Sequence, residues 1–243
     1  MDPNSIAVIA VRVRLPANLG SIARACRNFG VSDLRLVEPA AVPDEESHRL
    51  ASGADDLLEG LRRFDSLPLA VADLAVVVAT SSLRGRGEHR ALGPADLPAL
   101  VQEAGHTRIG FVFGPERSGM TEEELSHASV FLTLPTDPAF PTLNVSHAVA
   151  VTLAAASVAE PGPLTVEEEE LAPLREVEGA IEHWDRALDA IGFYDTGHRE
   201  RSLREWRRLI AGRPLSTRDV ALLRGVANRI LVSLRRKSTV DSQ

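Results

Sequence analysis

The chain has 243 residues, of which 44% are hydrophobic and 25% are charged, and its formal net charge is −7. This balance is typical of a globular protein with one full-sized domain, alone or with a small appendage. The single cysteine, Cys26, excludes an intrachain disulfide and indicates a reducing compartment. The apolar runs are too short to span a membrane, and the first residues lack a signal-peptide pattern, so we expect a cytoplasmic protein.

In chain order, short apolar runs predict strands, and segments with helical spacing lie between them. The predicted strands are 6–11, 34–37, 74–79, 109–113 and 130–134. The predicted helices are 21–30, 50–64, 94–104, one that begins at 121–124, and 144–158. This alternation indicates an α/β fold with a mostly parallel sheet, and the uniformly apolar strands indicate a sheet covered on both faces.

A boundary is predicted after this region, where a Pro-Gly-Pro stretch at 161–163 precedes four consecutive glutamates. Beyond it the spacing is helical only, over 171–191, 203–211 and 216–234. The sequence Ser216-Thr217-Arg218-Asp219 resembles a capping box at the start of the last helix. We therefore expect a domain at 1–160 and a small, all-α C-terminal extension at 161–243.

Charge is distributed unevenly along the chain. Residues 160–182 have a net charge of −7, whereas residues 199–237 hold twelve basic and three acidic residues. A basic segment in an acidic protein is a possible contact surface for nucleic acid, although a solvated helix face is an equally good interpretation. The same segment could instead support a dimer.

Several common functional motifs are missing. The chain has no GxGxxG after the first strand, no phosphate-binding GxxxxGK[ST] loop and no GxSxG nucleophile elbow. Its histidines and its cysteine do not have the spacing of zinc ligands, so no metal site is expected. A hydrolase built around a glutamate and a histidine would lack a credible nucleophile or metal set.

The informative polar segments all lie where a predicted strand ends, at 80–82, 114–116 and 142–144. In open α/β sheets ligands bind outside the carboxyl ends of the strands. Gly114 and Gly119 would let a ligand approach the backbone closely. Each segment taken singly is better explained by an ordinary turn between a strand and a helix, so the prediction of a ligand site depends on their joint occurrence.

Three motifs in this order resemble the SpoU/TrmH branch of the SPOUT RNA methyltransferases. The first is Asn18-Leu19-Gly20 with Arg24, the second is FGPERSGM with Glu116, and the third is LNVSHAV with Asn144 and Ser146. The resemblance implies S-adenosylmethionine as cofactor, a C-terminal trefoil knot that forms the cofactor pocket, and a homodimer with each active site at the subunit interface.

Within that family the chain is most similar to the TrmJ group, because of its GPERSG sequence and its helical extension. This similarity implies 2'-O-methylation of a pyrimidine in the tRNA anticodon loop, at position 32. Two alternatives stay open: a ribosomal-RNA 2'-O-methyltransferase of the same fold, and a non-catalytic RNA-binding protein. The segment 80–83 and Leu15, before Pro16, depart from the usual pattern of the group.

The resemblance assigns roles to individual residues. The catalytic assignments are Arg24, Asn18, Glu116, Asn144 and Ser146. The cofactor-binding assignments are Thr80, Ser81, Ser82, Gly114, Leu134, Thr142, Leu143 and Asn144. The candidates for RNA contact are Arg14, Arg84, Arg86 and Arg117. Arg24 would bind the adjacent phosphate and orient or polarise the ribose hydroxyl, or accept its proton, although a guanidinium is a poor base. Helix capping is the alternative for Asn18, Asn144 and Ser146.

Overall fold

The computed structural model describes residues 1–81, 91–115, 118–158, 170–194, 198–211 and 214–240, with Ala211 and residues 235–240 as backbone only. Their centre is a seven-stranded sheet with the strand order β3-β2-β1-β6-β4-β7-β5. Every strand pair in it is parallel. The strands are β1 (Ile6–Val11), β2 (Asp33–Val37), β3 (Arg62–Phe64), β4 (Val76–Thr80), β5 (Ala91–Leu92), β6 (Ile109–Phe113) and β7 (Val130–Leu132). The predicted α/β class with a mostly parallel sheet is confirmed.

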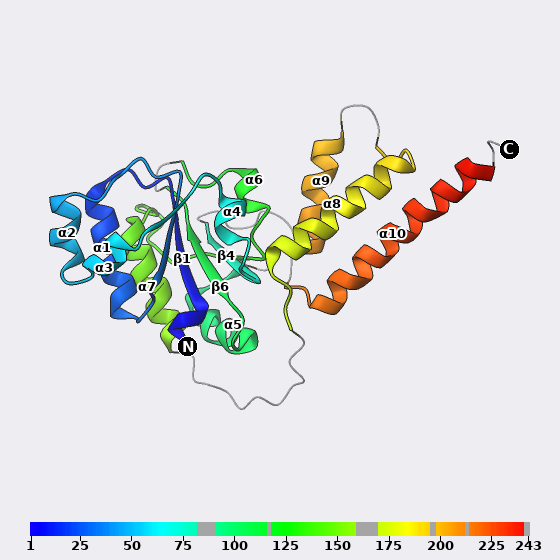
Figure 1. Ribbon diagram of the computed structural model, residues 1–243. Helices are drawn as coiled ribbons and strands as arrows, with labels where there is room; N and C mark the ends of the chain where they lie inside the picture. The colour runs from blue at the N-terminus through cyan, green and yellow to red at the C-terminus, as the bar shows by residue number, and fades with distance from the viewer. Residues whose placement is uncertain (82–90, 116–117, 159–169, 195–197, 212–213, 241–243) are drawn as a thin grey trace.

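Helices cover both faces of the sheet, as Figure 1 shows. Alternate residues of β1 point to opposite faces, so Ile6 and Val8 enter one apolar core and Ala7 and Ile9 the other. The first core is closed by α1 (Pro16–Asn28), α2 (Glu45–Ala51), α3 (Asp55–Glu59), α5 (Leu97–Ala104) and α7 (Val145–Ser157). The second is closed mainly by α4 (Leu67–Val71), α8 (Leu174–Ala190) and α10 (Thr217–Val240). Among the described residues, no helix is long and apolar enough to cross a membrane.

Most predicted strands lie within two residues of their observed bounds, but the helix predicted over 50–64 is wrong. There the chain forms the end of α2, the short α3 and then the edge strand β3. Ser52 and Gly53 both have positive φ, of 48° and 90°, and this left-handed backbone ends α2. Backbone pairing with β2 then holds Arg62–Phe64 extended despite its two arginines. The two-residue strand β5 was also not predicted.

Gly20, inside the first motif, has a packing role. A Cβ atom at this position would lie 2.0 Å from the carbonyl oxygen of Ser47, in α2. No side chain larger than hydrogen fits there without moving α2 away from α1. The close approach of these two helices is therefore one physical reason for a glycine after Asn18 and Leu19.

The helices after residue 170 complete the second core. Leu174 and Val177 of α8 are each 4% exposed and pack in the same apolar cluster as residues of β4 and β6. The amide of Leu174 donates to the carbonyl of Leu74 at 2.7 Å, just before β4. The predicted capping box at the start of α10 is present, because Ser216 and Asp219 exchange side-chain-to-backbone hydrogen bonds at 3.1 and 3.2 Å.

An outer contact also ties α8 and α9 (Arg199–Ala211) to the sheet region. The buried His127, which precedes β7, lies with its Nδ1 3.2 Å from Glu178 Oε1. Arg207 Nε donates to Glu178 Oε2 at 3.0 Å. Trp184 of α8 and Trp206 of α9 stack with ring centroids 6.0 Å apart. The helices after residue 170 and the sheet therefore share one core and one polar network.

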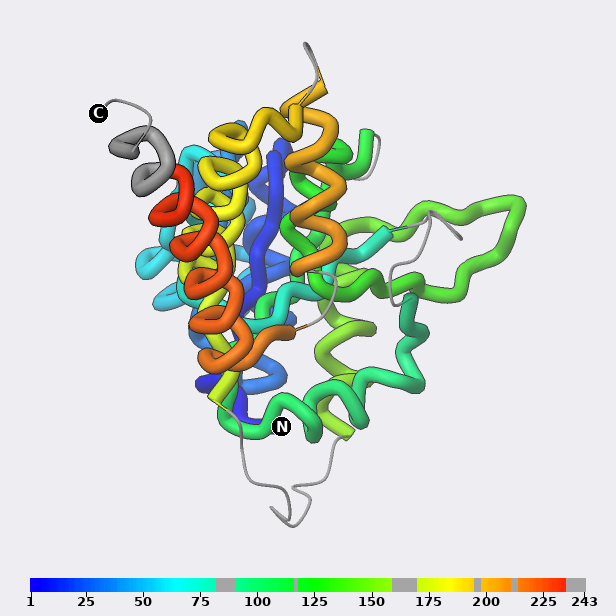
Figure 2. The backbone as a smooth tube through the Cα atoms, turned by 90° about the vertical axis from the view of Figure 1, so that its right-hand side faces the viewer, coloured from blue at the N-terminus to red at the C-terminus, as the bar shows by residue number. Residues whose placement is uncertain are grey.

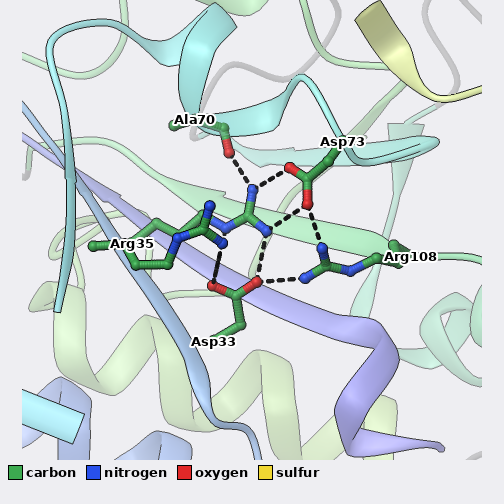
Figure 3. A network of polar contacts seen from close by, with 6 residues as sticks. Asp33, Arg35, Ala70, Asp73 and Arg108 are labelled. Atoms are coloured by element: carbon green, nitrogen blue, oxygen red, sulfur yellow. Dashed lines mark hydrogen bonds and ion pairs between the residues drawn. The ribbon is translucent and has the colours of Figure 1, made fainter. Parts of the chain in front are cut away.

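Figure 3 shows the polar contacts around a buried arginine, Arg35 of β2, whose partners Asp33, Asp73 and Arg108 lie at or before the amino ends of β2, β4 and β6. The side chain of Arg35 is 0% exposed, and its Nε and Nη atoms make five hydrogen bonds, to Asp33, Asp73 and the carbonyl of Ala70, at 2.5–3.0 Å. Arg108 pairs with both aspartates, and Arg62 lies 3.6 Å from Asp33 at the exposed edge of the network, so the two carboxylates are surrounded by three positive charges. All five N–H groups of the guanidinium are thus paired, as burial requires. The network lies at the sheet end opposite the polar segments predicted as ligand-binding, which indicates a structural role.

This network predicts a stability that depends on acid pH. Burial alone would raise the pKa of Asp33, but the hydrogen bonds and charges of Arg35 and Arg108 outweigh it, and the pKa lies below its usual value. Its contribution is therefore present above about pH 4 and is lost as the pH falls through the lowered pKa. We expect Asp33→Asn to lower the free energy of unfolding by about 3 kcal/mol at pH 7 and to flatten the loss of stability below pH 4.

Urea unfolding between pH 2.5 and 7 measures both effects. Asp56→Asn is the matched control, because Asp56 forms an exposed ion pair with Arg27 and should cost under about 0.5 kcal/mol. If the two variants lose the same stability at pH 7, the buried network does not stabilise the fold as argued.

Candidate functional site

A pocket of about 370 Å³ opens at the carboxyl ends of three neighbouring strands. Thr80, Phe113 and Leu132 are the last residues of β4, β6 and β7, which are adjacent in the sheet, and all three line the pocket. The other lining residues are Ser81, Gly114, Pro115, Ser118, Gly119, Met120, Leu125, Leu134, Thr136, Pro141, Thr142, Leu143, Val145 and Ala148. The pocket therefore lies where parallel α/β sheets bind their ligands.

Two chain segments form most of the wall: the turn after β6, and the extended segment between β7 and α7 that projects from the body in Figure 2. Gly114 lets the first of these fold tightly on itself. A Cβ atom at Gly114 would lie 2.8 Å from Met120 Cγ and 3.2 Å from the Met120 amide nitrogen. A side chain there would push the 118–120 turn outward and change the shape of the pocket.

The first and third motifs, 126 residues apart, meet beside this pocket. The side-chain amide of Asn144 donates to Asn18 Oδ1 at 3.0 Å. Asn144 Oδ1 in turn accepts from the backbone amide of Ser146 at 2.8 Å and from its hydroxyl at 2.7 Å. Asn144 is thus the N-cap of α7, so capping is observed for this residue and is compatible with a role in the site. Asn18 is not the cap of α1, whose N-cap is Leu15.

Of the predicted cofactor residues, those the structure describes line the pocket, apart from Asn144, which stands between two lining residues. The hydroxyl of Thr80 donates to the carbonyl of Val112 at 3.0 Å, so its hydrogen is already used inside the sheet. Ser82, Arg84, Arg86, Glu116 and Arg117 lie outside the described residues. The roles assigned to all these residues stay predictions.

Arg24 and Arg14 lie apart from the pocket lining. Both are exposed, and Arg24 projects from α1, the helix that also carries Asn18. Arg24 makes no hydrogen bond or ion pair with the part of the chain that the structure describes. An exposed guanidinium with no partner among the described residues is available for a phosphate ligand.

A charged contact that was not predicted from the sequence lies behind the 118–120 turn. Arg12, directly after β1, pairs through both terminal nitrogens with the carboxylate of Glu124, in α6 (Glu122–Leu125). It also donates to the carbonyl of Gly119 at 3.3 Å and lies 3.4 Å from Glu38. The capping-box spacing of Thr121 and Glu124 is a signal in the sequence for the local partner of Glu124, but no local pattern points to Arg12.

The chemistry open to the rest of the site is limited. Cys26 is fully buried, and burial raises the pKa of its thiol to about 12, so it is not a nucleophile near neutral pH. Among the described residues, no group of three or more histidine, cysteine or carboxylate side chains could hold a metal ion. The described site offers amides, hydroxyls, backbone groups and an arginine, which suit binding and positioning.

Comparison with known proteins decides the family. The model of the SpoU rRNA methylase family matches residues 5–154, more than half of the chain, and this span includes the pocket and the Asn18–Asn144 contact. The chain belongs to the SpoU methylase family. A second model, the C-terminal domain of the tRNA methyltransferase TrmJ, matches residues 175–239.

Individual SpoU methylases resemble the chain over nearly its whole length. It is 32% identical over 235 residues to the tRNA (cytidine/uridine/adenosine-2'-O-)-methyltransferase TrmJ of Pseudomonas aeruginosa strain UCBPP-PA14, covering 91% of each chain. It is 28% identical to the tRNA (cytidine/uridine-2'-O-)-methyltransferase TrmJ of Pectobacterium atrosepticum, covering 93% of this chain and 97% of that one. The crystal structure of TrmJ from Z. mobilis ZM4 superposes with a TM-score of 0.79 at 32% identity, covering 92% and 98%. The predicted resemblance to the TrmJ group within the SpoU methylases is confirmed.

Proposed function

We propose that this SpoU methylase transfers a methyl group from S-adenosylmethionine to a ribose 2'-oxygen of tRNA. The observation that carries the proposal is the meeting of the first and third motifs, through Asn18 and Asn144, beside a pocket at the carboxyl ends of β4, β6 and β7. The TrmJ relatives named above, similar over more than nine tenths of this chain, support tRNA as the substrate. The pocket and the paired motifs make a non-catalytic RNA-binding protein the weaker alternative.

The pocket fits the cofactor in size and chemistry. About 370 Å³ lies within the range of small-molecule sites. Leu134, Leu143 and Val145 offer an apolar wall for an adenine ring, while the backbone at Gly114 and Thr142 is open to polar groups. When bound, S-adenosylmethionine supplies a methyl group carried on a sulfonium sulfur. The sulfur departs as a neutral thioether and is therefore a good leaving group.

The work left to the protein is to bind, orient and deprotonate the ribose hydroxyl. Arg24 is proposed to bind the phosphate next to the target ribose and to orient its hydroxyl. A guanidinium stays protonated and is a poor base, which makes direct proton abstraction by Arg24 the less favoured route. Asn18, held by Asn144, is proposed to fix the ribose or Arg24 by hydrogen bonds. Glu116 is proposed to organise the turn after β6.

The finer architecture follows the family. We propose that the segments after β6 and β7 form a trefoil knot, supported by their joint contribution to one pocket and by the superposition on the Z. mobilis structure. We also propose a cytoplasmic homodimer, in which the partner would bring further groups to Arg24. The division into 1–160 and an all-α extension at 161–243 is supported by the separate family matches at 5–154 and 175–239.

The expected target is a pyrimidine ribose at position 32 of the anticodon loop. The named relatives methylate cytidine and uridine, and the P. aeruginosa protein adenosine as well, so the base preference of this chain must be measured. RNA contact is proposed for Arg14, Arg84, Arg86 and Arg117, with the arginines of α9 and α10 as further candidates. Such contacts attract phosphates without reading the base.

One experiment tests the reaction and its substrate together. The protein is incubated with methyl-labelled S-adenosylmethionine and either bulk tRNA or ribosomal RNA, and the labelled nucleotides are mapped by mass spectrometry. We expect label on the 2'-oxygen of a pyrimidine at position 32 of tRNA. Label confined to ribosomal RNA would replace the proposed substrate by the alternative one. Failure to bind the cofactor in a calorimetric titration would favour the non-catalytic alternative.

A further inference from the structure

Residues 118–121 form one wall of the pocket, with Ser118, Gly119 and Met120 in its lining, and one side chain holds this wall from behind. Arg12 leaves β1 in a left-handed backbone conformation, with φ of 51°, which is uncommon for a residue other than glycine. From there its guanidinium contacts both carboxylate oxygens of Glu124 and donates to the carbonyl of Gly119 at 3.3 Å. The backbone turn at Arg12 thus directs a planar, five-donor group at the back of the pocket wall.

Glu124 carries this contact into the turn itself. Its Oε2 accepts from the backbone amide of Thr121 at 2.6 Å, while Thr121 Oγ1 accepts from the amide of Glu124 at 3.1 Å. The same carboxylate therefore closes the capping box of α6 and holds Arg12. Burial raises the pKa of Glu124, but the hydrogen bonds and charge from Arg12 and Thr121 outweigh it, so the pKa is lowered and the carboxylate is charged at neutral pH.

The position of Arg12 along the chain shows which parts of the protein this contact joins. Three residues separate Arg12 from Pro16, the first residue of α1, which carries Asn18 and Arg24. Glu124 lies 112 residues further along the chain, and Gly119, which lines the pocket between Ser118 and Met120, lies 107 residues further along. The contact thus joins the segment that leads from β1 into α1, the helix that bears the proposed catalytic arginine, to one wall of the proposed cofactor pocket.

We infer that Arg12 is a positioning residue, which holds the 118–121 wall of the pocket in its binding conformation through Glu124 and the carbonyl of Gly119. The inference rests on the proposed function, because it takes the pocket ligand to be S-adenosylmethionine. Arg12 itself does not line the pocket. Without Arg12, only a fraction of the molecules keep the wall in its ordered conformation. The apparent affinity for S-adenosylmethionine then falls in proportion to that fraction.

Arg12→Met tests this directly. We expect the dissociation constant for S-adenosylmethionine, measured by calorimetry, to rise about tenfold. The KM for the cofactor should rise in parallel, while kcat at saturating cofactor stays within about threefold, because the bound ligand restores the ordered wall. A merely destabilised protein would show the reverse, with a lower active fraction and an unchanged dissociation constant.

Further variants distinguish the loss of the Arg12 contact from other causes of weaker cofactor binding. Arg12→Lys keeps a positive charge beside Glu124 and should recover most of the affinity. Glu38→Gln removes the exposed partner of Arg12 and is the matched control, with an expected change under twofold. Glu124→Gln and the Arg12→Met/Glu124→Gln double variant should weaken binding about as much as Arg12→Met alone. Full recovery in the double variant would show that an unpaired carboxylate causes the loss, and would overturn the inference.

Hydrogen exchange on the cofactor-free protein supplies a readout that does not depend on the proposed reaction. Peptides covering 118–125 should exchange faster in Arg12→Met than in the parent protein, while peptides from β1 should not change. Unchanged exchange there, with unchanged cofactor affinity, would contradict the role of Arg12. If the parent protein binds no S-adenosylmethionine at all, the proposed function fails, and the exchange comparison still decides whether Arg12 orders the wall.

Discussion

Arg24→Ala is expected to reduce methyl transfer to tRNA by at least about a hundredfold, because the phosphate and the ribose hydroxyl lose their positioning group. The affinity for S-adenosylmethionine should stay within about twofold, since Arg24 lies outside the pocket lining. The fold should also be unaffected, because Arg24 is exposed and makes no contact that the described residues would lose. Single-turnover assays at saturating cofactor, with calorimetry of cofactor binding, measure the two effects separately.

Arg27→Ala is the matched control on the same helix. Arg27 is exposed and forms an exposed ion pair with Asp56 at 2.8 Å, so its loss should change turnover by less than about threefold. Arg24→Lys should stay well below the parent activity, because an ammonium cannot make the two parallel hydrogen bonds of a guanidinium. Near-parental turnover in Arg24→Ala would exclude the assigned role.

Deleting residues 171–243 is expected to prevent folding rather than only remove an appendage. The larger side chains that this region buries in the core beneath α4 are Leu174, Val177, Ile181, Leu215 and Val220. Their burial is worth on the order of 10 kcal/mol, comparable to the whole stability of a typical domain. The truncated protein should be insoluble, or should bind a hydrophobic dye without a cooperative thermal transition.

Two substitutions test the same idea in the full-length chain. Val177→Asp places a carboxylate in a site that is 4% exposed, and it should cost more than about 3 kcal/mol in the free energy of unfolding. Val226→Asp introduces the same change on α10, where the side chain is 41% exposed, and should cost under about 1 kcal/mol. Similar losses in both, or a well-folded truncation, would show that the second core does not depend on α8.

This packing also bears on the basic segment. A deletion would confuse a loss of RNA contact with a loss of fold. The contribution of the 199–237 arginines to RNA binding is therefore better tested by neutralising exposed residues of α9, such as Arg204 and Arg208, and comparing the salt dependence of tRNA affinity.

Features that depend on residues close together in the chain could be predicted from the sequence. Continuous apolar runs predicted five of the seven strands, because a strand buried on both faces needs no alternation. The cap of α10 followed from the spacing of Ser216 and Asp219. The strand-end segments and the three motifs identified the family and indicated the region of the pocket, because parallel strands bring their carboxyl ends to one edge of the sheet.

Other features depend on partners far away in the chain, which local patterns cannot identify. Arg62–Phe64 became a strand because β2 offered free backbone groups, which outweighed its own weak preference. In the sequence, Arg35 is a charged residue in an otherwise apolar strand. Its burial is possible because Asp33 and Asp73 accept its hydrogen bonds and Arg108 pairs with the same carboxylates.

The sequence by itself determined the fold class, because that follows from local spacing and composition, and it indicated the family and the motif residues through the resemblance of three short motifs. The tertiary structure alone decided that Asn18 meets Asn144, that Arg12 holds Glu124 behind the pocket, and that α8 closes the second face of the sheet. The first two contacts join residues more than 100 positions apart, and α8 packs against strands that precede it by about 50 to 100 positions. Their pairing is fixed by how the elements pack, which depends on the whole core.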